Sequence, residues 1–112
     1  MAQREVRVAH LARQDMQRIL AWTREHFGPR QHAIYAKTIA LALRALVEDD
    51  TLASASARPR DDILSGIHLL DVARPGRKGR HIIIFRIDTA TNRIDVLRIL
   101  HDSMDVARHI QR

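Results

Sequence analysis

The 112-residue sequence contains no cysteine, which excludes disulfide bonds, thiolate catalysis and cysteine-ligated metal sites. Aromatic residues are scarce as well, with one Trp, one Tyr and two Phe, so a stacking platform for single-stranded nucleic acid is not expected. No apolar run approaches the roughly 20 residues of a membrane-spanning helix, and the charged start MAQREVRVAH lacks the apolar stretch of a signal peptide. We therefore expect a cytoplasmic protein with no membrane partner.

Motifs for cofactors and metals are also missing. The stretch PGRKG lacks the spacing and the trailing Lys-Ser/Thr of a phosphate-binding P-loop. His101, Asp105 and His109 are spaced four residues apart and would share one helical face, as ligands of a divalent metal would. However, His101 precedes the expected start of the last helix, and an ordinary polar face explains the pattern better. We expect no cofactor and no metal site.

Positive charge is abundant. Nineteen Lys and Arg residues stand against thirteen Asp and Glu, which gives a net charge of +6 and a pI near 11.2, and the only lysines are Lys37 and Lys78. This balance favours an anionic partner such as nucleic acid, an acidic protein or a membrane surface. An arginine-rich surface that is merely solvated remains the alternative, because net charge concerns association and not the fold.

The N-terminal half predicts a strand followed by two helices. Residues 4–9 (REVRVA) alternate in polarity, which is typical of a half-buried strand, and helical spacing begins near His10. Gly28 and Pro29 suit the end of one helix and the start of the next, so residues 10–47 should form an αα-hairpin. The positions expected on its buried face are Leu11, Met16, Ile19, Leu20, Trp22, Thr23 and Phe27 in the first helix and Tyr35, Ile39, Ala42, Leu43 and Leu46 in the second.

The C-terminal half predicts a sheet. Residues 51–65 are typical of a loop, residues 67–73, 82–87 and 94–100 of strands, and a short terminal helix should be capped by Asp102 or Ser103. In the last strand, Ile94, Val96 and Leu100 should share one face with Arg98, and Leu97 and Ile99 the other. The order predicts a single α+β domain spanning residues 1–112. An N-terminal strand and an αα-hairpin would pack on a mostly antiparallel sheet of three to four strands, followed by a short C-terminal helix.

Two groups of residues are candidates for function. The basic loop (residues 74–80, RPGRKGR) has four cations and no acid, and arginine forks match phosphates and carboxylates. An ordinary solvated turn explains it equally well. Metal-free RNA cleavage would need a base, an acid and cations, which His81 or His101 could supply with Arg80, Arg86 and Arg98. The spacing does not establish that these side chains converge, so binding or solvated groups are favoured over catalysis.

The element order and the C-terminal half resemble the RelE/ParE family of type II toxin–antitoxin toxins. The stretches GRKGRHIIIFRID and VLRILHDSMDVARHI carry the resemblance, which is strongest to the ParE branch at Arg98, Leu100, His101, Met104 and Asp105. Asp15, Ile19 and Gly28 are spaced as in the helical hairpin of such toxins. The resemblance covers essentially the whole chain, and its C-terminal motif is more specific to the family than to the cellular target.

The resemblance implies a small basic toxin that a cognate antitoxin, ParD-like or similar, neutralises by wrapping around it. ParE-like members poison DNA gyrase, whereas RelE-like members cut mRNA on the ribosome with basic residues and often a C-terminal tyrosine. The only tyrosine here is Tyr35, on the second expected helix. We therefore favour gyrase as the target. Ribosome-dependent mRNA cleavage, for which His101 could replace the tyrosine, and an inactive member that only binds its antitoxin are the alternatives.

These expectations select three sets of residues. If the chain is a ribonuclease, the catalytic candidates are Arg80, Arg86, Arg98 and His101. The residues expected to bind the target are Arg74, Arg77, Lys78, Arg80, Arg98 and His101. Those expected to bind the antitoxin are Leu20, Tyr35, Ile39 and Leu43.

Overall fold

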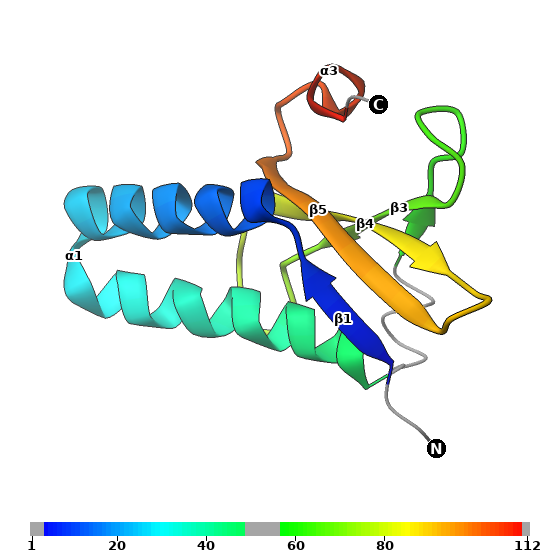
Figure 1. The fold of residues 1–112 in the computed structure, drawn as a ribbon. Coiled ribbons are helices and arrows are strands. Elements are labelled where there is room, and N and C mark those ends of the chain that lie inside the picture. The colour runs from blue at the N-terminus through cyan, green and yellow to red at the C-terminus, as the bar shows by residue number, and fades with distance from the viewer. Residues whose placement is uncertain (1–3, 49–56, 111–112) are drawn as a thin grey trace.

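The computed structural model describes residues 4–48 and 57–110. It consists of a helical hairpin packed on a five-stranded sheet (Figure 1). The strand order is β1-β5-β4-β3-β2, and all neighbours pair antiparallel except β1 and β5, which are parallel. No helix among the described residues is long and apolar enough to cross a membrane. The elements are β1 (Glu5–Val8), α1 (His10–Val47), β2 (Arg58–Pro59), β3 (Ile67–Asp71), β4 (His81–Asp88), β5 (Arg93–His101) and α3 (Val106–His109).

The predicted α+β fold is confirmed, with two differences. The sheet has a fifth strand, the two-residue β2, which lies inside the predicted loop; residues 51–56 of that loop lie outside the described residues. A proline in an edge strand is acceptable because only one side of the strand needs hydrogen bonds, but two residues are too few to give a sequence signal. The cap of α3 is Asp105, whose carboxylate accepts from the Ala107 N–H, and not Asp102 or Ser103 as predicted.

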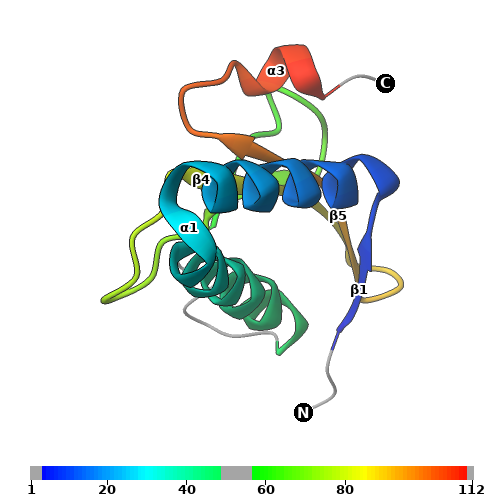
Figure 2. The ribbon, with the colours of Figure 1, turned by 90° about the vertical axis from the view of Figure 1, so that its left-hand side faces the viewer.

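The hairpin bends where the sequence predicts. Gly28 has φ 89° and ψ 172°, a conformation that interrupts the helix and that glycine adopts without a steric penalty, and Pro29 begins the next turn. α1 therefore consists of a first arm (residues 10–27) and a second arm (residues 29–47), which lie side by side and antiparallel (Figures 1 and 2). Both arms lie along the same side of the sheet.

Each face of the sheet carries an apolar core. Ile83 and Phe85 of β4 pack toward the hairpin, whereas Ile82 and Ile84 belong to a second cluster that Val106 of α3 helps to cover. β4 is therefore covered on both faces, as its near-continuous apolar sequence favours. Each of these side chains contributes about 1.5–3 kcal/mol by leaving water, which makes β4 the centre of the fold.

A β-bulge alters the faces of β5. Val96 pairs with Phe85 and Arg98 pairs with Ile84, so Leu97 has no partner on β4 and the alternation of side chains shifts by one residue. Ile99 consequently joins Ile94 and Val96 in the cluster under the hairpin, while Leu97 and Leu100 pack on the opposite face. The predicted common face for Ile94, Val96 and Leu100, and the one for Leu97 and Ile99, are wrong.

The buried face of the first arm also differs from the prediction. Leu11 is 53% exposed and Phe27 is 62% exposed, whereas Ala12 and Asp15 are buried. The predicted stripe missed Asp15 because a carboxylate rarely enters a core without a partner, and here Arg98 supplies one. In the second arm the prediction is confirmed, since Ile39, Ala42 and Leu46 are buried and Tyr35 and Leu43 pack against them.

Candidate functional site

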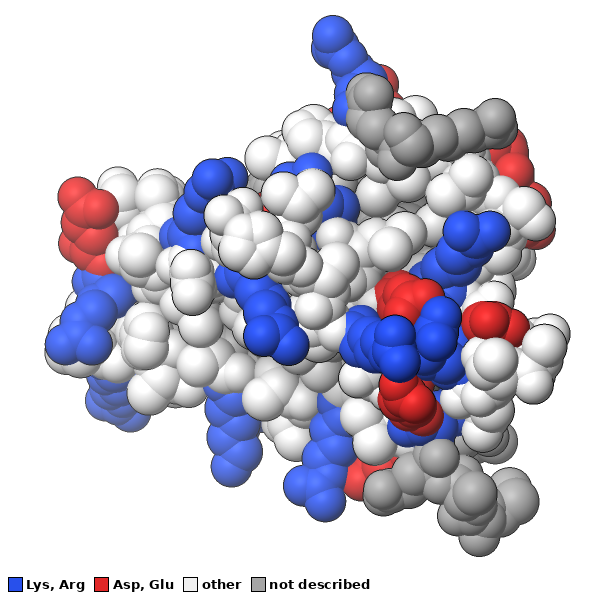
Figure 3. All heavy atoms as spheres, viewed as in Figure 1, with Lys and Arg blue, Asp and Glu red and all other residues white. Residues whose placement is uncertain are grey.

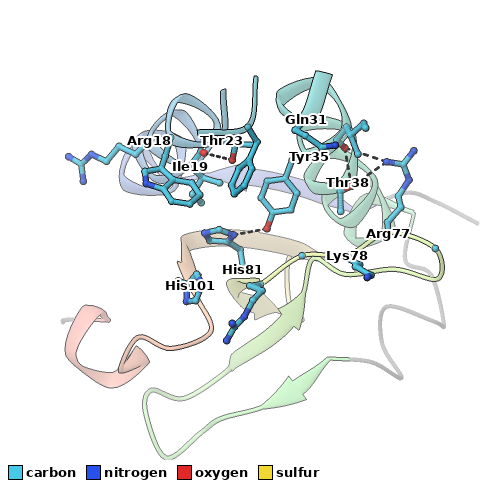
Figure 4. A pocket seen from close by; sticks show the side chains of 16 residues that line it. Arg18, Ile19, Thr23, Gln31, Tyr35, Thr38, Arg77, Lys78, His81 and His101 are labelled. Atoms are coloured by element: carbon cyan, nitrogen blue, oxygen red, sulfur yellow. Dashed lines mark hydrogen bonds between the residues drawn. The ribbon is translucent and has the colours of Figure 1, made fainter. Parts of the chain in front are cut away.

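A groove of about 910 Å³ opens between the two arms of α1 and the basic loop (Figure 4). Three of the four aromatic residues of the chain line it, and Trp22 and Phe27 are both more than half exposed. Such an exposed apolar cluster beside cations typically marks a partner-binding surface. The lining residues are Arg18, Ile19, Trp22, Thr23 and Phe27 of the first arm, Gln31, Ile34, Tyr35 and Thr38 of the second, residues 76–80 of the basic loop, and His81 and His101.

The basic loop is a tight turn that lies against the second arm. Arg74 and Arg77 exchange backbone hydrogen bonds of 2.9 and 2.8 Å, and Gly76 between them has φ 74°, which a residue with a side chain rarely adopts. Arg77 Nη1 donates to Thr38 Oγ1 at 3.2 Å and to the Ile34 carbonyl at 3.4 Å. Figure 2 shows the loop between β3 and β4 projecting beside the second arm.

The cations of the basic loop therefore differ in availability. Arg77 is tied to α1, and Arg74 donates to the backbone carbonyls of Asp71 and Ala73. Lys78 and Arg80 are exposed at the rim of the groove. Arg80 forms a bidentate pair with Asp102, with Nη2–Oδ1 and Nε–Oδ2 distances of 3.0 and 3.2 Å, and its side chain remains 71% exposed. A hydrogen bond from Arg80 is the main cause of the lowered pKa of Asp102.

Tyr35, His81 and His101 meet at the floor of the groove. The Tyr35 hydroxyl lies 2.6 Å from His81 Nδ1, and the rings of His81 and His101 are 5.3 Å apart and nearly perpendicular (Figure 4). Burial lowers the pKa of His81 to about 4, the nearby His101 adds to this effect, and Asp102 opposes it. Burial also raises the pKa of Tyr35. At neutral pH both groups are therefore uncharged, and the tautomer of His81 decides which of the two donates the hydrogen bond.

The four catalytic candidates do not converge. Arg80 and His101 line the groove, whereas Arg86 follows the side chains of Ile82 and Ile84 on the opposite face of the sheet. Arg98 forms a bidentate ion pair with Asp15, with Nε–Oδ2 2.7 Å and Nη2–Oδ1 2.9 Å, and the side chain of Arg98 is only 17% exposed. His101 Nδ1 accepts from the Ser103 N–H at 3.1 Å. Two of the four side chains are thus held away from the other two.

Three of the four residues predicted to bind the antitoxin pack into or against the core. Ile39 is 1% exposed, and Leu20 and Leu43 pack against the core under the hairpin. Of this set, Tyr35 lines the groove. Trp22, Phe27 and Ile34, which are not in the predicted set, are exposed at the groove. The signal that could have identified Trp22 and Phe27 is the surplus of large apolar residues in the first arm, which exceeds what one buried face accommodates.

Positive charge is spread over the surface of the protein. Figure 3 shows Lys and Arg side chains scattered over a face made mostly of other residues, with fewer acidic side chains, several of which touch a cation. Exposed pairs such as Arg7–Glu5, Arg58–Asp71 and Arg60–Asp62 neutralise part of this charge. Among the described residues, no group of three or more His, Asp or Glu side chains could hold a metal ion. His109 Nδ1 instead contacts the Asp105 carbonyl at 2.9 Å.

Comparison with known proteins identifies the family. Residues 6–106 match the family described as "ParE toxin of type II toxin-antitoxin system, parDE". The chain belongs to the ParE toxin family. It is 22% identical over 104 residues to Toxin ParE1 of Caulobacter vibrioides, covering 93% of this chain and 95% of that protein. It is thus a toxin of a type II toxin–antitoxin system, and the resemblance seen in the sequence is confirmed.

Two solved complexes have the same fold. A chain of the chromosomal ParDE system from P. aeruginosa superimposes with a TM-score of 0.68 at 18% identity, covering 88% of this chain and 95% of that one. A chain of the RelBE2 toxin–antitoxin complex from Mycobacterium tuberculosis superimposes with a TM-score of 0.52 at 20% identity, covering 89% and 99%. At these identities the likeness shows a fold common to the ParE and RelE toxins.

Proposed function

We propose that this ParE-family toxin acts in the cytoplasm by poisoning DNA gyrase through the exposed cations of the basic loop, and that a cognate antitoxin neutralises it by filling the groove. The observation that carries the proposal is the groove itself. Exposed Trp22, Phe27 and Ile34 lie on one side, and exposed Lys78 and Arg80 lie on the other.

The antitoxin segment should be amphipathic and acidic. An apolar helical face fits between the arms of a helical hairpin, and carboxylates on its other side would meet the cations at the rim. A second copy of the toxin is a poorer occupant, because two chains of net charge +6 repel one another. Trp22 and Phe27 would be the anchors, since buried aromatic side chains dominate the energy of many interfaces.

The separation of the catalytic candidates favours gyrase over RNA cleavage. Arg98 is engaged by Asp15, and Arg86 lies on the other face of the sheet. His81 is a weak base, since its pKa of about 4 is far below the neutral value that suits a general base. Of the four catalytic candidates, only Arg80 and His101 line the groove. Binding to an anionic surface of the target requires exposed cations but no general acid or base.

The test measures gyrase and ribosome activities side by side. Purified toxin should block supercoiling of relaxed plasmid and accumulate cleaved gyrase–DNA complexes, and it should leave ribosome-bound mRNA intact. Lys78→Ala/Arg80→Ala should lose gyrase poisoning. Arg44→Ala/Arg60→Ala removes two charges that do not line the groove and should keep it, because Arg44 pairs with Glu48 and Arg60 with Asp62.

Other outcomes select among the alternatives. Cuts in mRNA with unaffected supercoiling would reject gyrase as the target and restore the ribonuclease hypothesis. Loss of poisoning in both double variants would show that net charge matters and the position of the basic loop does not. A protein that binds its antitoxin and affects neither gyrase nor mRNA is an inactive member.

A further inference from the structure

The basic loop is held against the second arm of α1 at three points, and all three involve Tyr35 or its neighbours in that arm. We propose that Tyr35 is a positioning residue that sets the geometry in which Lys78 and Arg80 meet an anionic surface of the target. This inference rests on the proposed function, because it concerns the same loop and the same partner.

The first point is the close approach of Gly79 to the Tyr35 ring. A Cβ atom at position 79 would lie 2.7 Å from Val72 Cγ2, 3.0 Å from Tyr35 Cε1 and 3.1 Å from its hydroxyl oxygen. Val72 is fully buried and cannot move away. The backbone of the loop therefore lies directly on the tyrosine ring, and only glycine permits this contact.

The second point is the hydrogen bond between Tyr35 and His81. Its length of 2.6 Å fixes the phenol against the first residue of β4, immediately after Arg80. Because burial keeps both groups uncharged at neutral pH, no change of protonation disrupts this hydrogen bond there. His81 is uncharged at neutral pH and adds no positive charge to the rim of the groove. Its contribution is to hold Tyr35 in place through the hydrogen bond.

The third point lies on the other side of Gly79. Arg77 donates to the hydroxyl of Thr38, about one turn of helix after Tyr35, and to the carbonyl of Ile34, which immediately precedes Tyr35. Lys78 and Arg80 are the two immediate neighbours of Gly79, between the Arg77 and His81 attachments. A change in the Tyr35 contact must therefore move both exposed cations together. A loop without this support would lose conformational entropy on binding and would bind more weakly.

Tyr35→Phe tests the proposal, because it removes only the hydroxyl and keeps the ring under Gly79. We expect its affinity for immobilised gyrase to fall roughly 3- to 10-fold, the usual worth of one hydrogen bond. Thr91→Val also deletes one hydroxyl, at the exposed tip of the β4–β5 hairpin, and should bind like the wild type. In a Lys78→Ala/Arg80→Ala background, Tyr35→Phe should have no further effect, because the residues it positions are gone.

Two results would overturn the proposal. One is wild-type affinity in Tyr35→Phe, and the other is an equal loss in both backgrounds, which would indicate general damage to the fold. If the wild type itself does not bind gyrase, the proposed function fails, and hydrogen exchange decides the positioning role alone. The Val72 and Asp102 amides donate to the His81 and Arg80 carbonyls. Faster exchange of both in Tyr35→Phe supports the role, and unchanged exchange refutes it.

Discussion

Replacing Asp15 by alanine should destabilise the protein more than any other single change to a charged residue of α1. Its two carboxylate oxygens accept from Arg98 Nε and Nη2 at 2.7 and 2.9 Å, and Oδ2 also accepts from the Ile99 N–H at 3.0 Å. The side chains of Asp15 and Arg98 are only 8% and 17% exposed. This carboxylate therefore joins the first arm to β5 through both a side chain and the backbone.

The expected magnitude follows from what the alanine leaves behind. Removing one member of a buried ion pair costs about 3–5 kcal/mol, because the partner remains buried without compensation. The unpaired Ile99 N–H accounts for about 1–3 kcal/mol of such a loss if no water reaches it. Asp15→Asn retains one acceptor and should lose less, about 1.5–3 kcal/mol, the value of hydrogen bonds to a charged group.

Urea unfolding followed by Trp22 fluorescence or circular dichroism measures this loss. The midpoint should fall for Asp15→Ala and the slope m should stay constant, since the surface exposed on unfolding is unchanged. Arg44→Ala is the matched control, because it breaks an exposed pair with Glu48 that contributes only about 0–1 kcal/mol. If Asp15→Ala unfolds at the same urea concentration as the control, Arg98 is free for other roles and the structural argument is wrong.

Three further predictions concern the groove. Gly79→Ala should destabilise the protein by about 1–3 kcal/mol in thermal unfolding. Adding Val72→Ala to the Gly79→Ala variant should recover part of this loss, because it makes space for the new methyl group. The folded-state pKa of His81 is about 4 against an ordinary 6.5, so stability is complete above pH 6.5 and declines as pH falls toward 4. The decline should be about 1–2 kcal/mol after solvent screening, visible as a lower urea midpoint at pH 4.5 than at pH 7 and reduced in His81→Gln. Trp22→Ala should change stability by less than about 0.5 kcal/mol but weaken antitoxin binding by about 2 kcal/mol in calorimetry. Equal losses of stability and of antitoxin affinity in Trp22→Ala would mean that Trp22 supports the fold.

Local signals were sufficient to predict most of the fold. Gly28 and Pro29 mark the bend because each has a backbone preference that few other residues share. The run from Ile82 to Phe85 is apolar at every position, and both faces of β4 are indeed covered. Such features depend on neighbours in the sequence, which a single sequence contains.

Features that depend on distant neighbours were not predictable. The bulge at Leu97 contains no glycine that would predict it from the sequence. The ion pair between Arg98 and Asp15 joins residues 83 positions apart. For the same reason the groove could not be assembled, because Trp22 and Lys78 meet only through the tertiary packing of the hairpin. A helical pattern identifies large apolar residues but does not distinguish those that face the sheet from those that face a partner.

The structure also changes what the net charge of +6 means for binding. Of the predicted target-binding cations, Arg98 supports the fold, Arg77 holds the basic loop to α1, and Arg74 caps backbone carbonyls. Under the proposed function, recognition at the groove depends on Lys78 and Arg80, which remain exposed at its rim. The positions of charges decide a short-range contact, whereas the total charge governs long-range steering. Replacing Lys78 and Arg80 by alanine should therefore weaken target binding far more than removing two charges elsewhere.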